Sequence, residues 1–107
     1  MNLLFVCSRN KRRSLTAEKL FDGRCGNRAF SAGTETGARV RLTEGMLSRA
    51  DIIFCMEKKH VRRIREKYGD MAAGKKIVCL NIPDDCEYMD EELIELLESG
   101  VGEYLEG

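Results

Sequence analysis

Hydrophobic residues along the chain form two alternating patterns, which predict four strands and four helices. Four short apolar runs have the length of buried strands, and the stretches between them carry apolar residues at helical spacing. After the first run, Leu15, Ala17 and Phe21 recur at spacings of two to four residues, which fits one face of a helix. The predicted strands are 2–6, 28–31, 51–55 and 76–80, and the predicted helices are 14–21, 43–49, 58–68 and 90–97 or beyond.

Strands that alternate with helices in this way are typical of an α/β fold with a parallel sheet. We expect a single domain over residues 1–107, with three layers: a four-stranded parallel sheet with helices on both faces. Right-handed crossovers place the loops after the first and fourth strands at the same carboxyl edge of the sheet, where ligands bind in such folds. The sequence therefore predicts that Cys7, after the first strand, and Asp84, after the fourth, lie close together.

Cysteine usage and the last helix give further expectations about burial. Cys55 and Cys79 lie inside apolar runs and are expected in the core, whereas Cys25 and Cys86 fall in turn-like segments and are expected to be more exposed. The stretch 69–75 has the composition of a flexible connection. The last helix is expected to be capped by Asp90 and to bury the stripe Met89, Leu93, Leu96 and Leu97.

The charge balance gives no reason to expect a nucleic acid or an anionic membrane as partner. The chain has 18 basic and 18 acidic residues. The basic run 58–65 is predicted to be a solvated helix face, because Val61, Ile64 and Tyr68 form an apolar stripe beside it.

The apolar stretch before Cys7 is too short for a secretory signal or a membrane span. We therefore expect a cytoplasmic protein that works as a monomer.

No metal or cofactor is expected from the sequence. The five cysteines are an odd number without paired metal-ligand spacing, and His60 is the only histidine.

The candidate chemistry lies between the first strand and the first helix. Cys7 is followed, after five residues, by Arg13 and Ser14. The N-terminus of a helix offers unpaired backbone N–H groups and the positive end of the helix dipole, which favour both a thiolate and a bound phosphate. This layout is typical of the loop of a cysteine-dependent phosphatase.

Each residue of this loop has a predicted part in phosphate chemistry. Cys7 is the candidate nucleophile, Arg13 presents a planar fork that can hold two phosphoryl oxygens, and Ser14 can donate a hydrogen bond to the sulfur. The alternative for Cys7 is a buried structural thiol at the end of a strand. Three further cations in the same short loop, Arg9, Lys11 and Arg12, argue against that alternative. So many positive charges beside a buried thiol would be unfavourable without a bound anion. The predicted substrate-binding residues are Ser8, Arg9, Asn10, Lys11, Arg12 and Ser14.

With these residues the chain resembles the low-molecular-weight protein tyrosine phosphatases, and more closely a short branch of predicted tyrosine phosphatases. The resemblance runs nearly end to end, and only its first motif carries chemistry. The matching segments are Leu3-Leu4-Phe5-Val6-Cys7-Ser8-Arg9-Asn10, Arg13-Ser14, Ser31-Ala32-Gly33-Thr34-Glu35, Ala38-Arg39-Val40, Ala50-Asp51-Ile52-Ile53-Phe54, Met56-Glu57 and Ile82-Pro83-Asp84-Asp85.

The resemblance implies a phosphomonoesterase in which Cys7 attacks phosphorus and forms a phosphocysteine. It further implies that Asn10 shapes the loop and that an aspartate on a late loop protonates the leaving oxygen. Larger members have this aspartate directly before a proline, whereas here Asp84 and Asp85 follow Pro83. Asp84 is the preferred candidate, because it is nearer the strand, and Asp85 is the second. The expected substrate is a phosphorylated protein, above all phosphotyrosine, or a small phosphomonoester.

Three questions stay open at the level of sequence. The loop could hold a phosphorylated partner without turning it over, if neither aspartate reaches the leaving oxygen. Arsenate reduction is a minor alternative: Cys79 and Cys86 have the right separation, but the position after the third strand pairs Cys55 with Arg62 instead of a second cysteine. Tyr88 lines the pocket in one reading and packs beside the last helix in the other.

The charge of the loop predicts a substrate preference. Arg9, Lys11 and Arg12 favour phosphate groups flanked by further negative charge, as in acidic phosphopeptides or nucleotides.

Overall fold

The computed structural model describes residues 1–105, in which strands and helices alternate as the sequence predicts. Within this part of the chain, no helix is long and apolar enough to cross a membrane. The elements are β1 (Asn2–Cys7), α1 (Arg13–Phe21), the short 3-10 helix η1 (Arg24–Gly26), β2 (Arg28–Gly33), α2 (Glu44–Arg49), β3 (Ile52–Cys55), α3 (Lys58–Ala73), β4 (Lys76–Cys79) and α4 (Glu91–Leu105).

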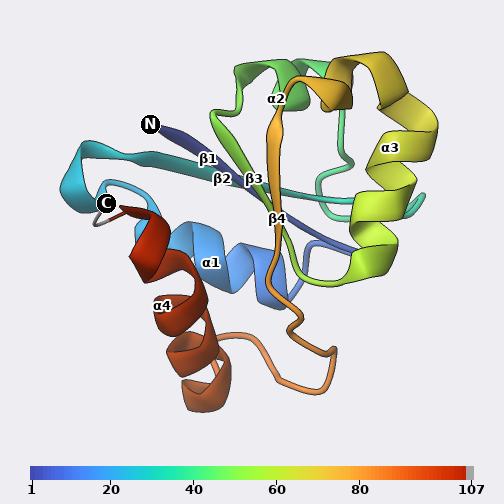
Figure 1. Ribbon diagram of the computed structural model, residues 1–107. Coiled ribbons are helices and arrows are strands. Elements are labelled where there is room, and N and C mark those ends of the chain that lie inside the picture. Colours follow the sequence, from blue (N-terminus) through green and yellow to red (C-terminus); the bar gives the residue numbers. More distant parts are fainter. Residues whose placement is uncertain (106–107) are drawn as a thin grey trace.

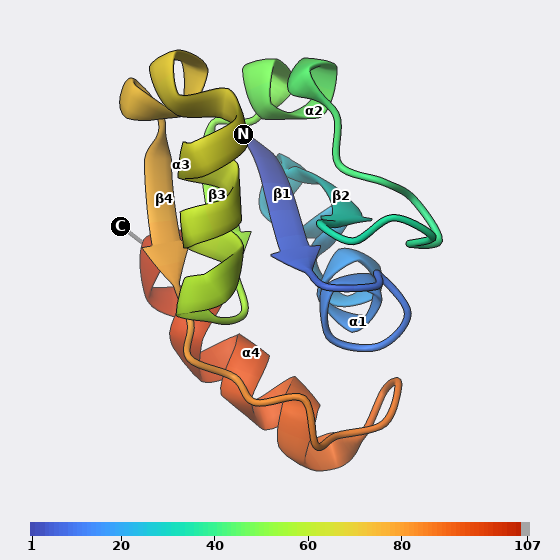
Figure 2. The same cartoon turned by 90° about the vertical axis from the view of Figure 1, so that its right-hand side faces the viewer.

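The four strands form one parallel sheet in the order β2-β1-β3-β4 (Figure 1). β1 is central, and its residue Leu4 pairs with Phe30 of β2 on one side and Ile53 of β3 on the other. Parallel strands place all their carboxyl ends at one edge. Figure 2 shows the β1–α1 loop and the long β4–α4 connection together at that edge. The predicted parallel α/β fold is confirmed.

Helices cover both faces of the sheet, because successive side chains of β1 point to opposite sides. The helices α1 and α4 lie on one face, and α2 and α3 lie on the other (Figure 1). Leu3 and Phe5 pack with the first pair, and Leu4 and Val6 pack with the second. On the first face Phe5 stacks on Phe21 at 5.7 Å and on Phe54 at 5.2 Å between ring centroids. The central strand therefore packs against a core on each face. This packing fixes the position and direction of Cys7, the last residue of β1.

Two helical segments differ from the expected elements. α3 continues to Ala73 instead of ending at Tyr68, so the predicted flexible connection is largely helical. The predicted end coincides with a kink, since Tyr68 has φ −124° and ψ 30° and its hydroxyl donates to the Leu42 carbonyl at 3.3 Å. η1 was not predicted, because three residues with Cys25 at φ 54° carry no periodic signal.

Some burial predictions were wrong. Cys86 is buried, with 5% exposed, although it lies in the irregular β4–α4 connection, and Cys79 is only half-buried because β4 is an edge strand. Met89 and Leu96 are exposed, so the buried stripe of α4 consists of Leu93, Leu97 and Val101. The expected cap is present: the Glu92 N–H donates to Asp90 Oδ1 at 2.9 Å. Cys55 is buried and Cys25 is exposed, as expected.

The segment after β2 braces the loop that follows β1. The Thr34 N–H donates to the Cys7 carbonyl at 2.9 Å, and the Glu35 N–H donates to the Ser8 carbonyl at 3.0 Å. Gly33 makes this approach possible, because a Cβ atom there would lie 2.5 Å from the Ser8 carbonyl oxygen. The backbone of Cys7 and Ser8 is therefore held by the segment that follows β2.

Candidate active site

The residues between β1 and α1 form a loop that turns around the sulfur of Cys7. Asn10 has φ 59°, in the left-handed region, and its backbone N–H donates to Cys7 Sγ at 3.2 Å. α1 begins at Arg13, so the first N–H groups of this helix have no partner within the helix and lie next to the loop. The sulfur is buried, with Cys7 only 3% exposed. The chain thus presents one thiol at the positive end of a helix.

The buried side chains of Asn10 and Ser14 form a short line of hydrogen bonds that ends at this thiol. The Asn10 Nδ2 group donates to Ser14 Oγ at 2.7 Å, and Ser14 Oγ lies 2.9 Å from Cys7 Sγ. Because Ser14 Oγ accepts the amide hydrogen, its own hydrogen is free to point at the sulfur. Both side chains are fully buried and neither lines the cavity described next. Of the predicted substrate-binding residues, Asn10 and Ser14 therefore contact the sulfur instead of the cavity.

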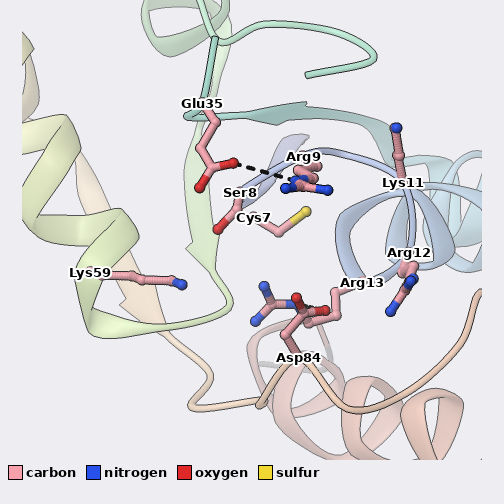
Figure 3. Close-up of a pocket in the computed structure, with 9 residues that line it drawn as sticks. All are labelled: Cys7, Ser8, Arg9, Lys11, Arg12, Arg13, Glu35, Lys59 and Asp84. Carbon is pink, nitrogen blue, oxygen red and sulfur yellow. Dashed lines mark ion pairs between the residues drawn. The ribbon is translucent and has the colours of Figure 1, made fainter. Parts of the chain in front are cut away.

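A cavity of about 430 Å³ opens above Cys7 and is strongly cationic (Figure 3). Five of its residues carry a positive charge and two carry a carboxylate. One carboxylate, Glu35, lies 3.5 Å from Arg9, so that part of the loop's charge is already paired. The lining residues are Cys7, Ser8, Arg9, Lys11, Arg12, Arg13, Glu35, Lys59 and Asp84. The geometry suits a compact, multiply charged anion in direct contact with the thiol.

Arg13 is the largest fully buried side chain, and its guanidinium is held in place by two segments far along the chain. Its Nη1 donates to Glu57 Oε2 at 2.6 Å and to the Ile82 carbonyl at 2.8 Å, and its Nε lies 3.6 Å from Asp84 Oδ1. Burial tends to raise the pKa of the Glu57 carboxyl, but the hydrogen bond and charge of Arg13 outweigh burial and lower that pKa. The remaining N–H groups of Arg13 are those available to an anion in the cavity.

Asp84 and Asp85 differ in where they lie. Asp84 lines the cavity and faces Arg13 (Figure 3). Both aspartates are exposed, but Asp85 does not line the cavity, and its Oδ1 accepts from Cys86 Sγ at 3.6 Å. Tyr88 is 45% exposed and is not among the lining residues. The β4–α4 connection is tied to α1 by the Met89 N–H, which donates to Thr16 Oγ1 at 3.0 Å. Of the two aspartates, Asp84 is the one that lines the cavity above Cys7.

Sequence reasoning missed the part played by Glu57 and His60. His60 is 1% exposed, its Nδ1 accepts from the Glu57 N–H at 3.0 Å, and its Nε2 lies 2.9 Å from Ser8 Oγ. Because Nδ1 accepts, the ring hydrogen is on Nε2 and is donated to Ser8. Burial, aided by the charge of Arg13, lowers the pKa of His60 to about 4. His60 therefore stays neutral near pH 7 and fixes the orientation of the Ser8 hydroxyl at the cavity.

The lowered pKa of His60 predicts a loss of stability in mild acid. An unfolded chain takes up a proton on His60 below about pH 6.5, whereas the folded chain does so only near the lowered value. The free energy of unfolding should therefore fall as the pH falls through this window, by about 2 kcal/mol between about pH 7.5 and about pH 5. Urea unfolding at the two pH values measures this change. His60→Gln should show a smaller change in the free energy of unfolding. Equal changes in both proteins would contradict the lowered pKa of His60 as the cause.

Comparison with known proteins supports the fold at low sequence identity. No protein-family model matches the chain, and no curated protein matches it. The tyrosine phosphatase Wzb from Escherichia coli K30, solved in complex with phosphate, is 20% identical, with a TM-score of 0.77 over 98% of this chain and 96% of its own.

Two further solved structures are similar along almost their whole length. The low-molecular-weight protein tyrosine phosphatase from T. tengcongensis is 23% identical, with a TM-score of 0.76 over 99% of this chain and 98% of its own. The YwlE arginine phosphatase from Geobacillus stearothermophilus is 20% identical, with a TM-score of 0.73 over 98% of this chain and 92% of its own. At this identity the similarity establishes the fold, which is that of the low-molecular-weight protein tyrosine phosphatases.

Proposed function

We propose that this chain is a cysteine-dependent protein tyrosine phosphatase that works through a phosphocysteine on Cys7. The observation that carries the proposal is the placement of the Cys7 sulfur. It accepts the Asn10 N–H at 3.2 Å and lies 2.9 Å from Ser14 Oγ, at the base of a cationic cavity that Asp84 also lines. Hydrogen bonds to sulfur stabilise a thiolate, and the cations above it attract the phosphate that the thiolate would attack.

In the first step the Cys7 thiolate attacks phosphorus, so that a phosphorus–sulfur bond forms while the bond to the leaving oxygen breaks. Protonated Asp84 gives its proton to the leaving oxygen, which departs as the free alcohol or phenol. The first N–H groups of α1 and the guanidinium of Arg13 bind the phosphoryl oxygens, where negative charge spreads in the transition state. Glu57 and the Ile82 carbonyl hold that guanidinium in position.

In the second step water attacks the phosphorus of the phosphocysteine. The Asp84 carboxylate, left without its proton by the first step, takes a proton from this water. The phosphorus–sulfur bond breaks, inorganic phosphate is released and Cys7 returns as a thiolate. Ser14 Oγ, 2.9 Å from the sulfur, favours this departure because it can donate a hydrogen bond to the developing thiolate.

Charge in the cavity favours phosphotyrosine over phosphoarginine as the substrate. Similar solved structures include phosphatases of both kinds, so the fold does not separate the two. A phosphoarginine side chain carries a guanidinium, which would enter a cavity with five cationic and two anionic residues. Matched peptides with either phosphorylated residue test this choice. We expect a higher kcat/KM for the phosphotyrosine peptide, and a higher value for the phosphoarginine peptide would overturn the proposed specificity.

The assignment of the general acid predicts a dependence on the leaving group. Asp84→Asn should lower kcat for a phosphotyrosine peptide by about 10²-fold, because the phenol oxygen needs a proton as it leaves. The loss should be smaller for an aryl phosphate with a highly acidic phenol, which leaves without this help. Both rates can be measured in one buffer series.

Asp85→Asn is the matched control, since Asp85 neighbours Asp84 but does not line the cavity. A larger loss in Asp85→Asn than in Asp84→Asn would reverse the assignment. Equal losses of Asp84→Asn on both kinds of substrate would remove Asp84 from the acid role.

A further inference from the structure

A second cavity, of about 320 Å³, adjoins the cavity above Cys7. The two share Ser8, Glu35 and Lys59, so they are joined along one side of the β1–α1 loop. In Figure 3 the Lys59 side chain reaches from the start of α3 toward the first cavity. The residues that line the second cavity are Ser8, Thr34, Glu35, Lys59, His60, Arg62, Arg63 and Glu66.

Two arginines of the second cavity differ from the arginines of the Cys7 loop in their ion pairing. Arg9 and Arg12 have ion-pair partners in Glu35 and Glu87. Arg62 and Arg63 are exposed and form no ion pair with any residue in the described part of the chain. An anion brought to this cavity would therefore meet two free guanidinium groups.

One cation of the second cavity lies at the positive end of the α3 dipole. Lys59 is in the first turn, where acidic residues are usually favoured, and Arg62 and Arg63 follow in the next turn, where the effect of the dipole has fallen off. The first turn of α3 contains no acidic residue, although the N-cap is Glu57, whose carboxylate is bound to Arg13. Cations at this end of a helix are unfavourable for the folded chain alone, and a bound anion would offset that cost.

We propose that the second cavity binds an acidic side chain of the substrate, so that the preferred substrate is a phosphotyrosine peptide with a glutamate or aspartate close to the phosphorylated residue. This inference rests on the proposed function, since it assumes that the phosphate occupies the cavity above Cys7. The flanking carboxylate contacts Arg62 and Arg63, and Lys59 lies between the two anions. These residues, on α3, determine specificity without taking part in the chemistry.

The test compares phosphotyrosine peptides that differ only in a flanking glutamate or glutamine, placed on either side of the phosphotyrosine. The measured quantity is the ratio of kcat/KM for the acidic peptide to that for the neutral one, at low salt. We expect a ratio of roughly five for at least one placement, falling toward one as added salt shortens the screening length. A ratio near one for both placements would overturn the proposal.

Two double variants locate the preference. Arg62→Gln with Arg63→Gln should bring the ratio close to one. Arg65→Gln with Lys67→Gln removes the same charge from exposed positions of α3 outside both cavities and should leave the ratio near its original value. Equal ratios in the two double variants would overturn the proposal.

Separate measurements distinguish the phosphatase activity at Cys7 from the binding of an acidic side chain in the second cavity. Hydrolysis of para-nitrophenyl phosphate needs only the cavity above Cys7, so its absence would count against the phosphatase and leave the second cavity to be tested by binding. Dissociation constants of the same peptides for Cys7→Ser, measured by calorimetry, provide that test. The acidic peptide should bind roughly fivefold more tightly, and equal affinities would contradict the proposal.

Discussion

Replacing Cys7 by serine is expected to reduce the turnover of para-nitrophenyl phosphate on the order of 10⁴-fold or more. A serine hydroxyl stays protonated near neutral pH, and the hydrogen bonds that Asn10 and Ser14 provide are arranged around a sulfur. Release of the phenol, followed in the presence of a chelator, measures the loss. Cys25→Ser is the matched control, because Cys25 is an exposed thiol in η1, and it should keep full activity.

Substantial activity in Cys7→Ser would contradict the assignment of the nucleophile. The same variant should still bind inorganic phosphate, since the first N–H groups of α1, Arg13 and the other cations of the cavity remain. Calorimetry with phosphate measures this binding. Lost turnover together with retained binding separates a missing nucleophile from an unfolded protein.

Replacing Arg13 by lysine should lower kcat by about 10²- to 10³-fold although the charge is kept. The guanidinium fork donates to Glu57 and to the Ile82 carbonyl and still offers N–H groups to the cavity. A lysine ammonium is a single point and cannot make these contacts together. The variant should also lose about 1–2 kcal/mol of stability, since a buried hydrogen-bonded charge is replaced by one with fewer partners. Steady-state kinetics and urea unfolding measure the two effects.

Arg24→Lys is a suitable comparison for Arg13→Lys. Arg24 makes a two-pronged contact with Glu98, with distances of 2.7 and 2.8 Å, but this pair is exposed and lies outside the cavity above Cys7. Its loss should change stability little and kcat not at all. If Arg13→Lys retained normal kcat, or if both variants lost activity equally, Arg13 would have no specific part in binding the phosphoryl group.

The elements that the sequence predicts well are those dictated by local pattern. The run around Leu4 and Phe5 is apolar without a break, as a strand covered on both faces must be, and β1 has this environment. The close approach of Cys7 and Asp84 was also predictable, because parallel strands place their following loops at one edge. Ser14 beside the sulfur follows from its place in the first turn of a helix that starts next to Cys7.

The contacts that sequence reasoning missed join segments far apart in the chain. Glu57 and His60 look like the ordinary start of a basic helix, and their functions depend on a side chain from another segment. Glu57 binds Arg13, 44 residues earlier, and His60 binds Ser8, 52 residues earlier. The available signal was the single histidine placed three residues after Glu57, directly beyond β3. The sequence alone does not show that this histidine contacts Ser8, because the two residues meet only in the folded chain.

Burial of irregular segments was equally hard to predict. Cys86 lies in a connection without periodicity, yet it joins the core that the sheet shares with α1 and α4, and the same connection is tied to α1 by the hydrogen bond from Met89 to Thr16. Met89, expected in the core, has φ 59°, precedes the start of α4 at Glu91 and is 39% exposed. Local sequence does not set such positions, which follow from the path of the whole connection between β4 and α4.

Detection of a phosphocysteine would show whether Cys7 forms a covalent bond to phosphorus during turnover. The protein is mixed with para-nitrophenyl phosphate, quenched during turnover, digested and analysed by mass spectrometry. We expect one phosphoryl group on the peptide that contains Cys7. More of it should accumulate in Asp84→Asn, because Asp84 also accepts the proton of the attacking water and its loss slows the second step. Turnover with no phosphoryl group on Cys7 at any quench time, and undiminished in Cys7→Ser, would contradict it.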